Sequence, residues 1–288
     1  MQLPNVVAGL WRLHEWGLDV PARVRWIEQA LEAGVDTFDY ADIYGGYGVE
    51  ALFGEALAAA PGLRERLRIV TKFGIKLVSP ARPAHGVKSY DSSRAHIVTS
   101  VENALAALRT DRIELLLVHR PDWLAHPDEI AAAFDELHRA GKVLAFGASN
   151  HTPRQFGMLH RRFALATHQF EFSALQMQAL ADGTLEQGAD LGLRPMAWSP
   201  LGGGRLFAEG DEQARRVRGE LEVIGRRLGV APATVAYAWV MRHPARPVPV
   251  TSTRRIEGLR EAIAAVAIEL PREDWYGIWQ ASMGHELP

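Results

Sequence analysis

The chain contains no cysteine among its 288 residues. Without cysteine there is no disulfide framework, no cysteine nucleophile and no thiolate metal site. No apolar run approaches the roughly 18 residues that a membrane-spanning helix needs. Residues 1–10 also lack the charged segment and the long apolar core of a signal peptide. We therefore expect a soluble cytoplasmic protein that has no membrane partner.

An excess of charge of one sign is also missing. The formal net charge is -2, the sequence pI is about 6.6, and acidic and basic residues are interspersed. A nucleic-acid-binding protein would be expected to carry a basic patch or stripe, and this chain has none. We expect a small molecule as the binding partner, no nucleic acid, and a monomer.

Short apolar runs alternate with helical patterns along the whole chain. The run at 113–119, IELLLVH, has no polar alternation and so favours a parallel strand that is covered on both faces. Helix starts are marked by Ser93, which can cap a helix, and by Thr152, Pro153 and Gln155, which form a capping box with proline at the first helical position. Eight strands are predicted at residues 6–9, 35–39, 67–72, 113–119, 144–149, 166–170, 195–198 and 248–250.

This alternation predicts an α/β fold, a (β/α)8 TIM barrel. Two helices exceed the repeat: one of the consecutive pair at 211–228 and 232–242, and the last helix at 272–281. Length alone would suggest about two domains, but barrels of this size are common as one domain. Because no linker or low-complexity tract interrupts the chain, we expect a single domain over residues 1–288. Residues 73–92 are expected to form a long loop, with 76–90 as a lid over the site.

Four polar residues lie at or just after the ends of consecutive predicted strands: Asp39, Tyr44, Lys72 and His119. Parallel barrels carry their reactive groups at the carboxyl ends of strands, so these four should meet on one face. Free tyrosine has a pKa of about 10 and donates a proton poorly near neutrality unless a cation favours its phenolate. Lys72 can be that cation and Asp39 its partner, while His119 can hydrogen-bond to a substrate oxygen. The set predicts protonation of a carbonyl oxygen, with hydride supplied by a cofactor.

Eight segments carry a resemblance to a known family. They are GLWRL at 9–13, DYADIYGGYG at 39–48, TKFG at 71–74, LLLVHRPD at 115–122, FGASN at 146–150, HQFE at 168–171, PMAWSPLGGGRL at 195–206 and TSTRRIEGLREAI at 251–263. In these segments the chain resembles the aldo-keto reductase family, particularly the bacterial YdhF-like oxidoreductases. The resemblance implies NADPH-dependent reduction of aldehyde or ketone carbonyls to alcohols. It also implies that Tyr44 is the general acid, that Lys72 and Asp39 tune it, and that His119 orients the carbonyl.

The same resemblance implies a nicotinamide-cofactor site. Ser149, Asn150 and Gln169 would hold the carboxamide, and Trp198 would stack on the nicotinamide ring. Arginines beside a helix start suit a ribose 2'-phosphate by charge and by helix dipole, which favours NADPH/NADP+ over NADH. The other implied cofactor residues are Gly9, Trp11, Ser199, Leu201, Gly203 to Arg205, Ser252, Thr253, Arg254 and Glu261, with Arg255 and Arg260 as neighbouring candidates.

The chain departs from the family pattern at several points. His168 stands where the family often has asparagine, and Gly258 and Ala262 stand where a long polar residue and an asparagine are common. The amino-terminal hairpin of many relatives is not expected, and the residues after Ala281 leave little for a carboxyl-terminal substrate loop. Because Gly258 and Ala262 lack long polar side chains, we expect weaker contacts to the adenine end of the cofactor.

Alternatives remain open at this stage. Lys72 alone could form a Schiff base in an aldolase barrel, although Tyr44 would then be unused. A barrel that binds cofactor but serves as a regulatory or interaction subunit with little turnover is the second alternative. Gly202 to Gly204 does not match the G-x-G-x-x-G fingerprint, so a Rossmann domain is not supported.

Two sets of residues complete the expectations. The histidines lack the spacing of metal ligands, so we predict no metal site and solvated surface positions for His85, His96, His126, His151 and His160. The substrate pocket could be lined by Trp11, Tyr47, Tyr90 and Trp123, which could equally pack under loops.

Overall fold

The computed structural model describes residues 2–287. Eight parallel strands form a closed barrel in the order β1-β10-β9-β8-β7-β6-β3-β2, which confirms the predicted barrel. The chain divides into two compact units, one with residue 2 and Ala8–His168, the other with Leu3–Val7 and residues 169–287. The single domain over 1–288 stays a prediction.

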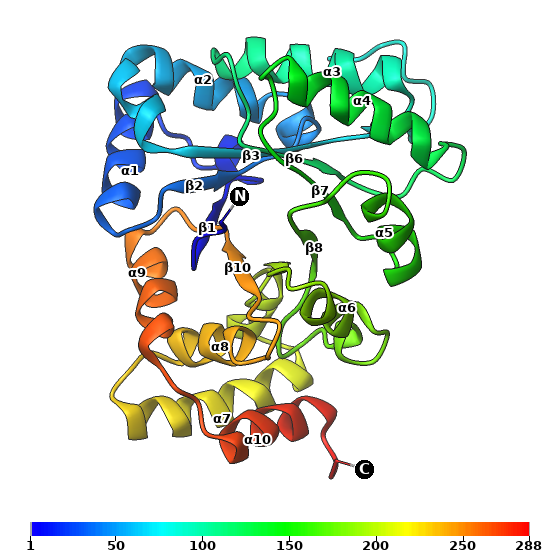
Figure 1. Cartoon of the computed structure of the whole chain (residues 1–288). Helices are drawn as coiled ribbons and strands as arrows, with labels where there is room; N and C mark the ends of the chain where they lie inside the picture. The colour runs from blue at the N-terminus through cyan, green and yellow to red at the C-terminus, as the bar shows by residue number, and fades with distance from the viewer. Residues whose placement is uncertain (1, 288) are drawn as a thin grey trace. The chain divides into compact units, whose positions relative to one another are not determined.

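The first unit follows the predicted alternation of strands and helices. Figure 1 shows α1 to α4 in succession along the outer side of β2, β3 and β6. Its strands are β1 (Val7–Gly9, whose first residue belongs to the second unit), β2 (Thr37–Asp39), β3 (Arg68–Phe73), β6 (Leu115–Val118), β7 (Phe146–Ser149) and the first residue of β8 (His168–Glu171). Its helices are α1 (Val20–Glu32), α2 (Val49–Ala59), α3 (Arg94–Leu108), α4 (Pro127–Arg139) and α5 (Pro153–His160).

The side chains predicted to cap helix starts make the expected hydrogen bonds. The Ser93 hydroxyl accepts from the backbone N–H of His96 at 3.3 Å at the start of α3. At the start of α5 the Thr152 hydroxyl accepts from the Gln155 backbone N–H at 3.2 Å, and the Gln155 side chain accepts from the Thr152 backbone at 2.9 Å. These bonds satisfy N–H groups that the first helical turn leaves without partners.

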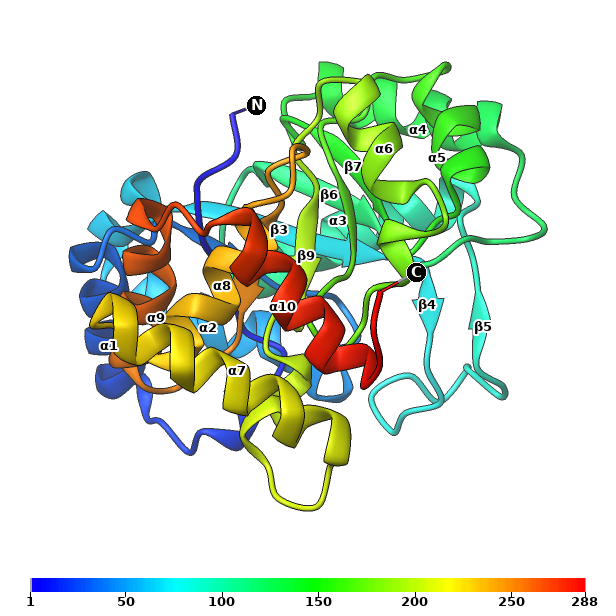
Figure 2. The ribbon, with the colours of Figure 1, turned by 90° about the horizontal axis from the view of Figure 1, so that it is seen from below.

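The second unit contains the helices that exceed the repeat. Its elements are α6 (Thr184–Asp190), β9 (Met196–Trp198), α7 (Glu212–Leu228), α8 (Pro232–Met241), β10 (Val248–Thr251), α9 (Ile256–Ala264) and α10 (Arg272–Met283). Figures 1 and 2 both show α7 alongside α10, and the two helices pack together. Trp239 of α8 stacks on Trp275 of α10 with the ring centres 5.1 Å apart. Each indole N–H donates to the backbone carbonyl of the other residue. Because both buried indoles are hydrogen-bonded, this pair fixes α10 against α8.

Residues 73–92, which we expect from the sequence to form a long loop, contain regular secondary structure. They contain an antiparallel pair, β4 (Ile75–Lys76) and β5 (Ser89–Tyr90), visible side by side in Figure 2. Strands of two residues are too short to show alternation, so the sequence carries no period for them. Short 3-10 helices occupy Leu13–Glu15, Tyr44–Gly46, Pro61–Arg66, Gln178–Leu180, Gly202–Phe207 and Ala265–Ala267.

Several strand limits also differ from the expected ones. The second strand begins at Thr37 rather than at residue 35, and the fifth barrel strand begins at Phe146 rather than at residue 144. Ile113 and Val143 form only an isolated bridge before β6 and β7. Within residues 2–287, no helix is both long enough and apolar enough to cross a bilayer.

The contact between α2 and α3 generates a stability prediction. A Cβ atom at Gly54 would lie 2.0 Å from the backbone oxygen of Ala107. We expect Gly54→Ala to lower the free energy of unfolding by about 3 kcal/mol or more, because the two helices must separate. Gly219 of α7 has no atom within 4 Å of such a Cβ, so Gly219→Ala should raise stability by roughly 0.5 to 1 kcal/mol. Urea denaturation of both variants tests this, and equal midpoints would rule out the close approach.

Candidate active site

The buried Lys72 ammonium is bonded to three oxygen atoms in the first unit. Its Nζ donates to Asp39 Oδ1 at 2.5 Å, to the backbone oxygen of Tyr40 at 2.5 Å and to the Tyr44 hydroxyl at 3.4 Å. Asp39 ends β2, Lys72 lies in β3, and Tyr44 begins the 3-10 helix that follows β2. An ammonium has three N–H donors, and here each has an oxygen partner. The strands thus bring together three of the predicted residues.

His119, the fourth residue, lies directly after β6 against Tyr44. The two rings are 5.9 Å apart at 81°, an edge-to-face arrangement. The backbone N–H of His119 donates to the Phe73 carbonyl at 2.9 Å, and its own carbonyl accepts from the Asn150 amide at 3.1 Å. Its side-chain Nδ1 is buried without a hydrogen-bond partner among the described residues. The backbone of His119 is therefore fixed on both sides, while its ring packs against Tyr44.

The protonation of Tyr44 and Lys72 reflects a balance between burial and charge. Burial raises the pKa of Tyr44, and Lys72 opposes this rise without overcoming it. Lys72 thus acts in the expected direction, but the net pKa of the phenol is raised rather than lowered. Burial lowers the pKa of Lys72, yet Asp39 and Tyr44 more than compensate, so its pKa is raised. Near neutral pH the phenol therefore keeps its proton and the lysine keeps its charge.

His119 is neutral under the same conditions. Burial lowers its pKa well below the ordinary value, and the positive charges of Lys72, Arg120 and Lys88 lower it further. A neutral imidazole has one N–H donor and one acceptor nitrogen. Such a ring can donate to a substrate oxygen without placing a second positive charge beside Lys72.

Glu50 is a buried acidic residue behind β3 that the sequence did not indicate. Its carboxyl, on α2, accepts from the Thr71 hydroxyl at 2.6 Å, and burial raises its pKa to about 7. Thr71 precedes Lys72 on β3, so the two side chains point to opposite faces of the strand. An acidic residue in the first turn of a helix is ordinary, so no signal in the sequence distinguished it.

The implied cofactor residues of the first unit lie at strand ends. Gly9 ends β1 and Ser149 ends β7, both buried. Asn150 follows in a left-handed conformation (φ 59°), and its amide donates to Ser149 Oγ at 2.8 Å. Trp11 is 44% exposed, with the Arg12 guanidinium 4.2 Å from its ring centre.

In the second unit the implied residues fall into two groups, the first around β8, β9 and the loop after β9. Gln169 is buried in β8 and its amide approaches Met196 Sδ at 3.9 Å, while Trp198 ends β9. Left-handed backbone follows at Ser199 (φ 51°) and at Gly202, Gly203 and Gly204, which form one turn with Leu201. Arg205 at the end of this turn pairs with Asp211 at 2.6 Å.

The second group lies between β10 and α9. Ser252 and Arg254 are exposed, and the Thr253 hydroxyl accepts from the backbone N–H of Arg255 at 3.1 Å. Arg260 and the half-buried Glu261 lie on α9. A Cβ at Gly258 would lie 3.0 Å from the Thr253 side chain, so a larger residue there would have to displace Thr253. This contact is a physical reason for glycine at 258.

The candidate substrate residues have varied surroundings. The Tyr47 hydroxyl accepts from the Leu77 backbone N–H at 2.8 Å, and the Arg82 guanidinium lies 4.7 Å from its ring centre. Tyr47 therefore ties down the segment 76–90. Tyr90 is 38% exposed and Trp123 is 80% exposed. Their role, and that of Trp11, stays a prediction.

The expectation of solvated histidines is wrong for His151. Its ring nitrogen Nδ1 hydrogen-bonds to the Ser149 backbone carbonyl at 2.8 Å, and its backbone N–H donates to Nε2 of the buried His168 at 3.2 Å. Burial lowers the pKa of His151 to about 4 and that of His168 to about 3. His85, His96 and His160 are also partly buried, and only His126 of the five is exposed. Within the described part of the chain, no group of three or more histidine or acidic side chains could hold a metal ion.

The raised pKa of Glu50 predicts a pH-dependent stability. Because burial raises the pKa of folded Glu50 from 4.5 to about 7, the folded state holds the proton to higher pH than the unfolded state does. The free energy of unfolding therefore falls as pH rises from the unfolded pKa of 4.5 through the folded pKa of about 7. The total loss is roughly 3 kcal/mol, because each pKa unit corresponds to about 1.4 kcal/mol. Glu50→Gln keeps an acceptor for Thr71 and should remove the loss. Urea denaturation at about pH 5 and about pH 8 measures it.

The matched control is Glu222→Gln on the exposed face of α7. It should keep the wild-type dependence of stability on pH. If Glu50→Gln loses as much stability as the wild type between the two pH values, Glu50 is not the titrating group.

Comparison with known proteins gives the chain its family. The model of the Aldo/keto reductase family matches residues 5–282. The chain is 46% identical to Oxidoreductase YdhF of Escherichia coli, over 100% of this chain and 96% of YdhF. It is 41% identical to a 6-dehydroglucose reductase of Agrobacterium fabrum, over 100% and 97% of the two chains.

Its structure resembles the crystal structure of a thermostable aldo-keto reductase in complex with the inhibitor epalrestat. The TM-score is 0.80 at 25% identity, with 98% of this chain and 96% of that chain covered. The match to the family model over nearly the whole chain and the high identity to YdhF agree with the motifs and with the barrel. The chain belongs to the aldo/keto reductase family.

Proposed function

We propose that this protein is an NADPH-dependent oxidoreductase that reduces an aldehyde or ketone carbonyl to an alcohol. The observation that carries the proposal is the Tyr44 hydroxyl held 3.4 Å from the Lys72 ammonium, which is itself bonded to Asp39. A phenol beside a fixed cation is suited to protonating an oxygen that gains negative charge.

Each residue has a distinct part in this proposal. Tyr44 gives its phenolic proton to the carbonyl oxygen, and Lys72 stabilises the phenolate that remains. Asp39 holds the lysine in place through the 2.5 Å ion pair. His119 donates one hydrogen bond to the same oxygen and orients the carbonyl. The raised pKa of Tyr44 keeps the proton on the phenol until the substrate oxygen becomes more basic.

The side chains fit a phosphorylated nicotinamide cofactor. NADPH, when bound, supplies the hydride that no side chain of the four can give. Ser149, Asn150 and Gln169 offer hydroxyl and amide groups for its carboxamide. Arg254 and its neighbours before α9 offer positive charge and helix-start N–H groups for a ribose phosphate. These donors support NADPH over NADH, although Gly258 leaves the adenine end with less to hold it.

The name of one relative supports a proposal for the substrate class. A protein 41% identical to this chain is a 6-dehydroglucose reductase. We propose a hydroxylated sugar carbonyl as the first substrate class to assay, before apolar aldehydes and diketones. The monomeric state and the cytoplasmic location stay predictions.

The role of Tyr44 is tested by Tyr44→Phe. Because general-acid catalysis contributes about 100-fold to 10,000-fold, we expect kcat for NADPH oxidation to fall by at least about 100-fold. The phenylalanine ring retains the edge contact with His119, so the fold and cofactor affinity should be kept. Tyr276→Phe on the exposed face of α10 is the control and should be as fast as the wild type. Equal rates for Tyr44→Phe and wild type would remove Tyr44 from the mechanism, and no turnover in either would favour a regulatory barrel.

The cofactor preference is tested by Arg254→Ala. Loss of a charged hydrogen bond to a phosphate should weaken NADPH binding by about tenfold or more and NADH binding by less than about twofold. Fluorescence titration with each cofactor measures both affinities. Arg139→Ala on the exposed end of α4 is the charge-matched control. Equal weakening of both cofactors would move the phosphate site elsewhere.

A further inference from the structure

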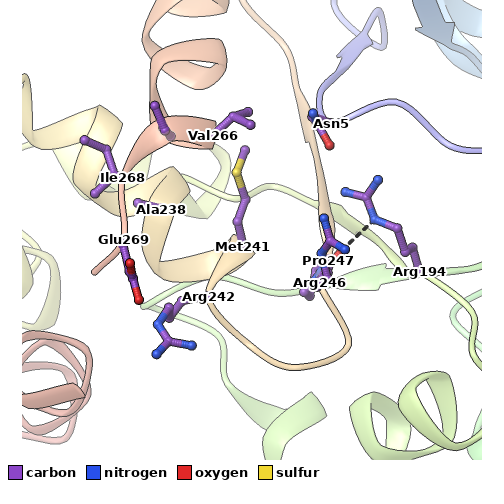
Figure 3. Close-up of a pocket in the computed structure, with 12 residues that line it drawn as sticks. Asn5, Arg194, Ala238, Met241, Arg242, Arg246, Pro247, Val266, Ile268 and Glu269 are labelled. Atoms are coloured by element: carbon purple, nitrogen blue, oxygen red, sulfur yellow. Dashed lines mark hydrogen bonds between the residues drawn. The ribbon is translucent and has the colours of Figure 1, made fainter. Parts of the chain in front are cut away.

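A cavity of about 540 Å³ lies in the second unit, before the amino ends of β9 and β10 (Figure 3). Arg194 precedes β9, and Arg246 and Pro247 precede β10. Tyr44 and Lys72, by contrast, lie at or beyond the carboxyl half of their strands, where barrels carry out their chemistry. The size is within the range of small-molecule sites. The proposed carbonyl reduction makes no use of this cavity.

One end of the cavity holds two arginines in a fixed arrangement. Arg194 donates from Nη1 to the carbonyls of Leu3 and Pro4, at 3.3 and 3.1 Å, and from Nε to the carbonyl of Arg246 at 3.2 Å. Figure 3 shows the two arginines facing one another beside Asn5. Backbone carbonyls therefore position the Arg194 guanidinium before any ligand arrives.

The charge of Arg246 has no acidic partner among the described residues. Its side chain takes part in none of the ion pairs there and is exposed. Burial and the nearby charge of Arg246 lower the pKa of Arg194, so the two positive charges interact unfavourably. An anion between them would relieve this repulsion, because Arg guanidinium groups bind carboxylate and phosphate in a fork geometry.

The backbone conformation of Arg246 also indicates a role for its side chain. Arg246 has a left-handed conformation (φ 51°), and its N–H donates to the His243 carbonyl at 2.7 Å. A non-glycine residue in this region costs roughly 1 to 2 kcal/mol, and glycine would avoid the cost. An arginine at this turn is therefore not favoured by the turn itself.

The floor of the cavity is apolar. Ala238 and Met241 come from the end of α8, and Val266, which is 45% exposed, comes from the 3-10 helix after α9. In Figure 3 the Met241 side chain lies between Val266 and the two arginines. Arg242 and Glu269 lie at the far end, where Arg242 donates to the Leu270 carbonyl at 3.0 Å. A cationic end joined to an apolar floor suits a ligand with an oxyanion and a hydrocarbon body.

We propose that this cavity binds a small organic anion. Its carboxylate or phosphate lies against Arg194, Arg246 and Asn5, and its hydrocarbon body covers Met241 and Val266. A neutral molecule of the same shape would leave the paired positive charges uncompensated, and a bare inorganic anion would leave the apolar floor in water.

NMR of methyl-labelled methionine in the full chain tests the proposal. Met241 is one of six methionines, and its signal is assigned with Met241→Leu. The probes are octanoate, octyl phosphate and octanol. We expect a saturable shift of the Met241 signal with octanoate or octyl phosphate, and the tighter of the two identifies the oxyanion. Octanol should bind about tenfold more weakly or worse, because it lacks the charge.

Arg246→Ala should weaken binding of the anionic probe by about tenfold or more. The variant keeps the backbone carbonyl that Arg194 uses, and Arg246→Lys should restore part of the affinity. Arg25→Ala, at an exposed position on α1, is the charge-matched control and should bind as the wild type does. The proposal is overturned by any of three results: no saturable shift with either anion, equal affinity in Arg246→Ala, or octanol binding as tightly as octanoate.

Discussion

A buried ammonium group at Lys72 constrains β2, β3 and the turn after β2. Moving a charge out of water is costly unless partners replace the lost hydration. The chain provides three oxygen atoms, from Asp39, Tyr40 and Tyr44, which are delivered by β2 and the turn that follows it. Since β2 and β3 are hydrogen-bonded neighbours, strand pairing itself sets the distance between lysine and carboxylate. The Tyr44 hydroxyl is thereby placed beside the Lys72 ammonium, at 3.4 Å.

Burial then gives each group of the site a different protonation state. The same desolvation raises the pKa of Tyr44 and lowers that of His119, while at Lys72 the interactions with Asp39 and Tyr44 outweigh it and raise the pKa. The result near neutral pH is a protonated phenol, a neutral imidazole and a charged lysine. These states suit the proposed protonation of a carbonyl oxygen. Glu50 adds a buried carboxyl on the outer side of β3 whose charge depends on pH in the neutral range.

The grouping of Asp39, Tyr44, Lys72 and His119 could be predicted from the sequence, because the ends of parallel strands can be located from the apolar runs. Asp39, Lys72 and His119 each end an apolar run or follow it directly, and parallel strands must bring such ends together. Glu50 could not be found in this way, because its burial depends on how α2 packs on β3. The hairpin β4–β5 was missed because its strands are two residues long. The predicted starts of β2 and β7 were two residues too early, because hydrogen bonding between neighbouring strands, and not the apolar run, decides where a strand begins.

The cavity before the amino ends of β9 and β10 could not be predicted from the sequence either, since Asn5, Arg194 and Arg246 are far apart along the chain. The energetic consequences of binding there differ from those of binding beside Lys72. A ligand that binds only the folded chain stabilises it by mass action, whatever happens to substrate. It would alter carbonyl reduction only if its affinity differed between two states of the catalytic residues. Arg194 is held by the backbone carbonyls of Leu3 and Pro4, which precede β1, so an anion bound there would add to the contacts that hold this segment in the folded chain. The expected effect of such a ligand is therefore on stability before it is on rate.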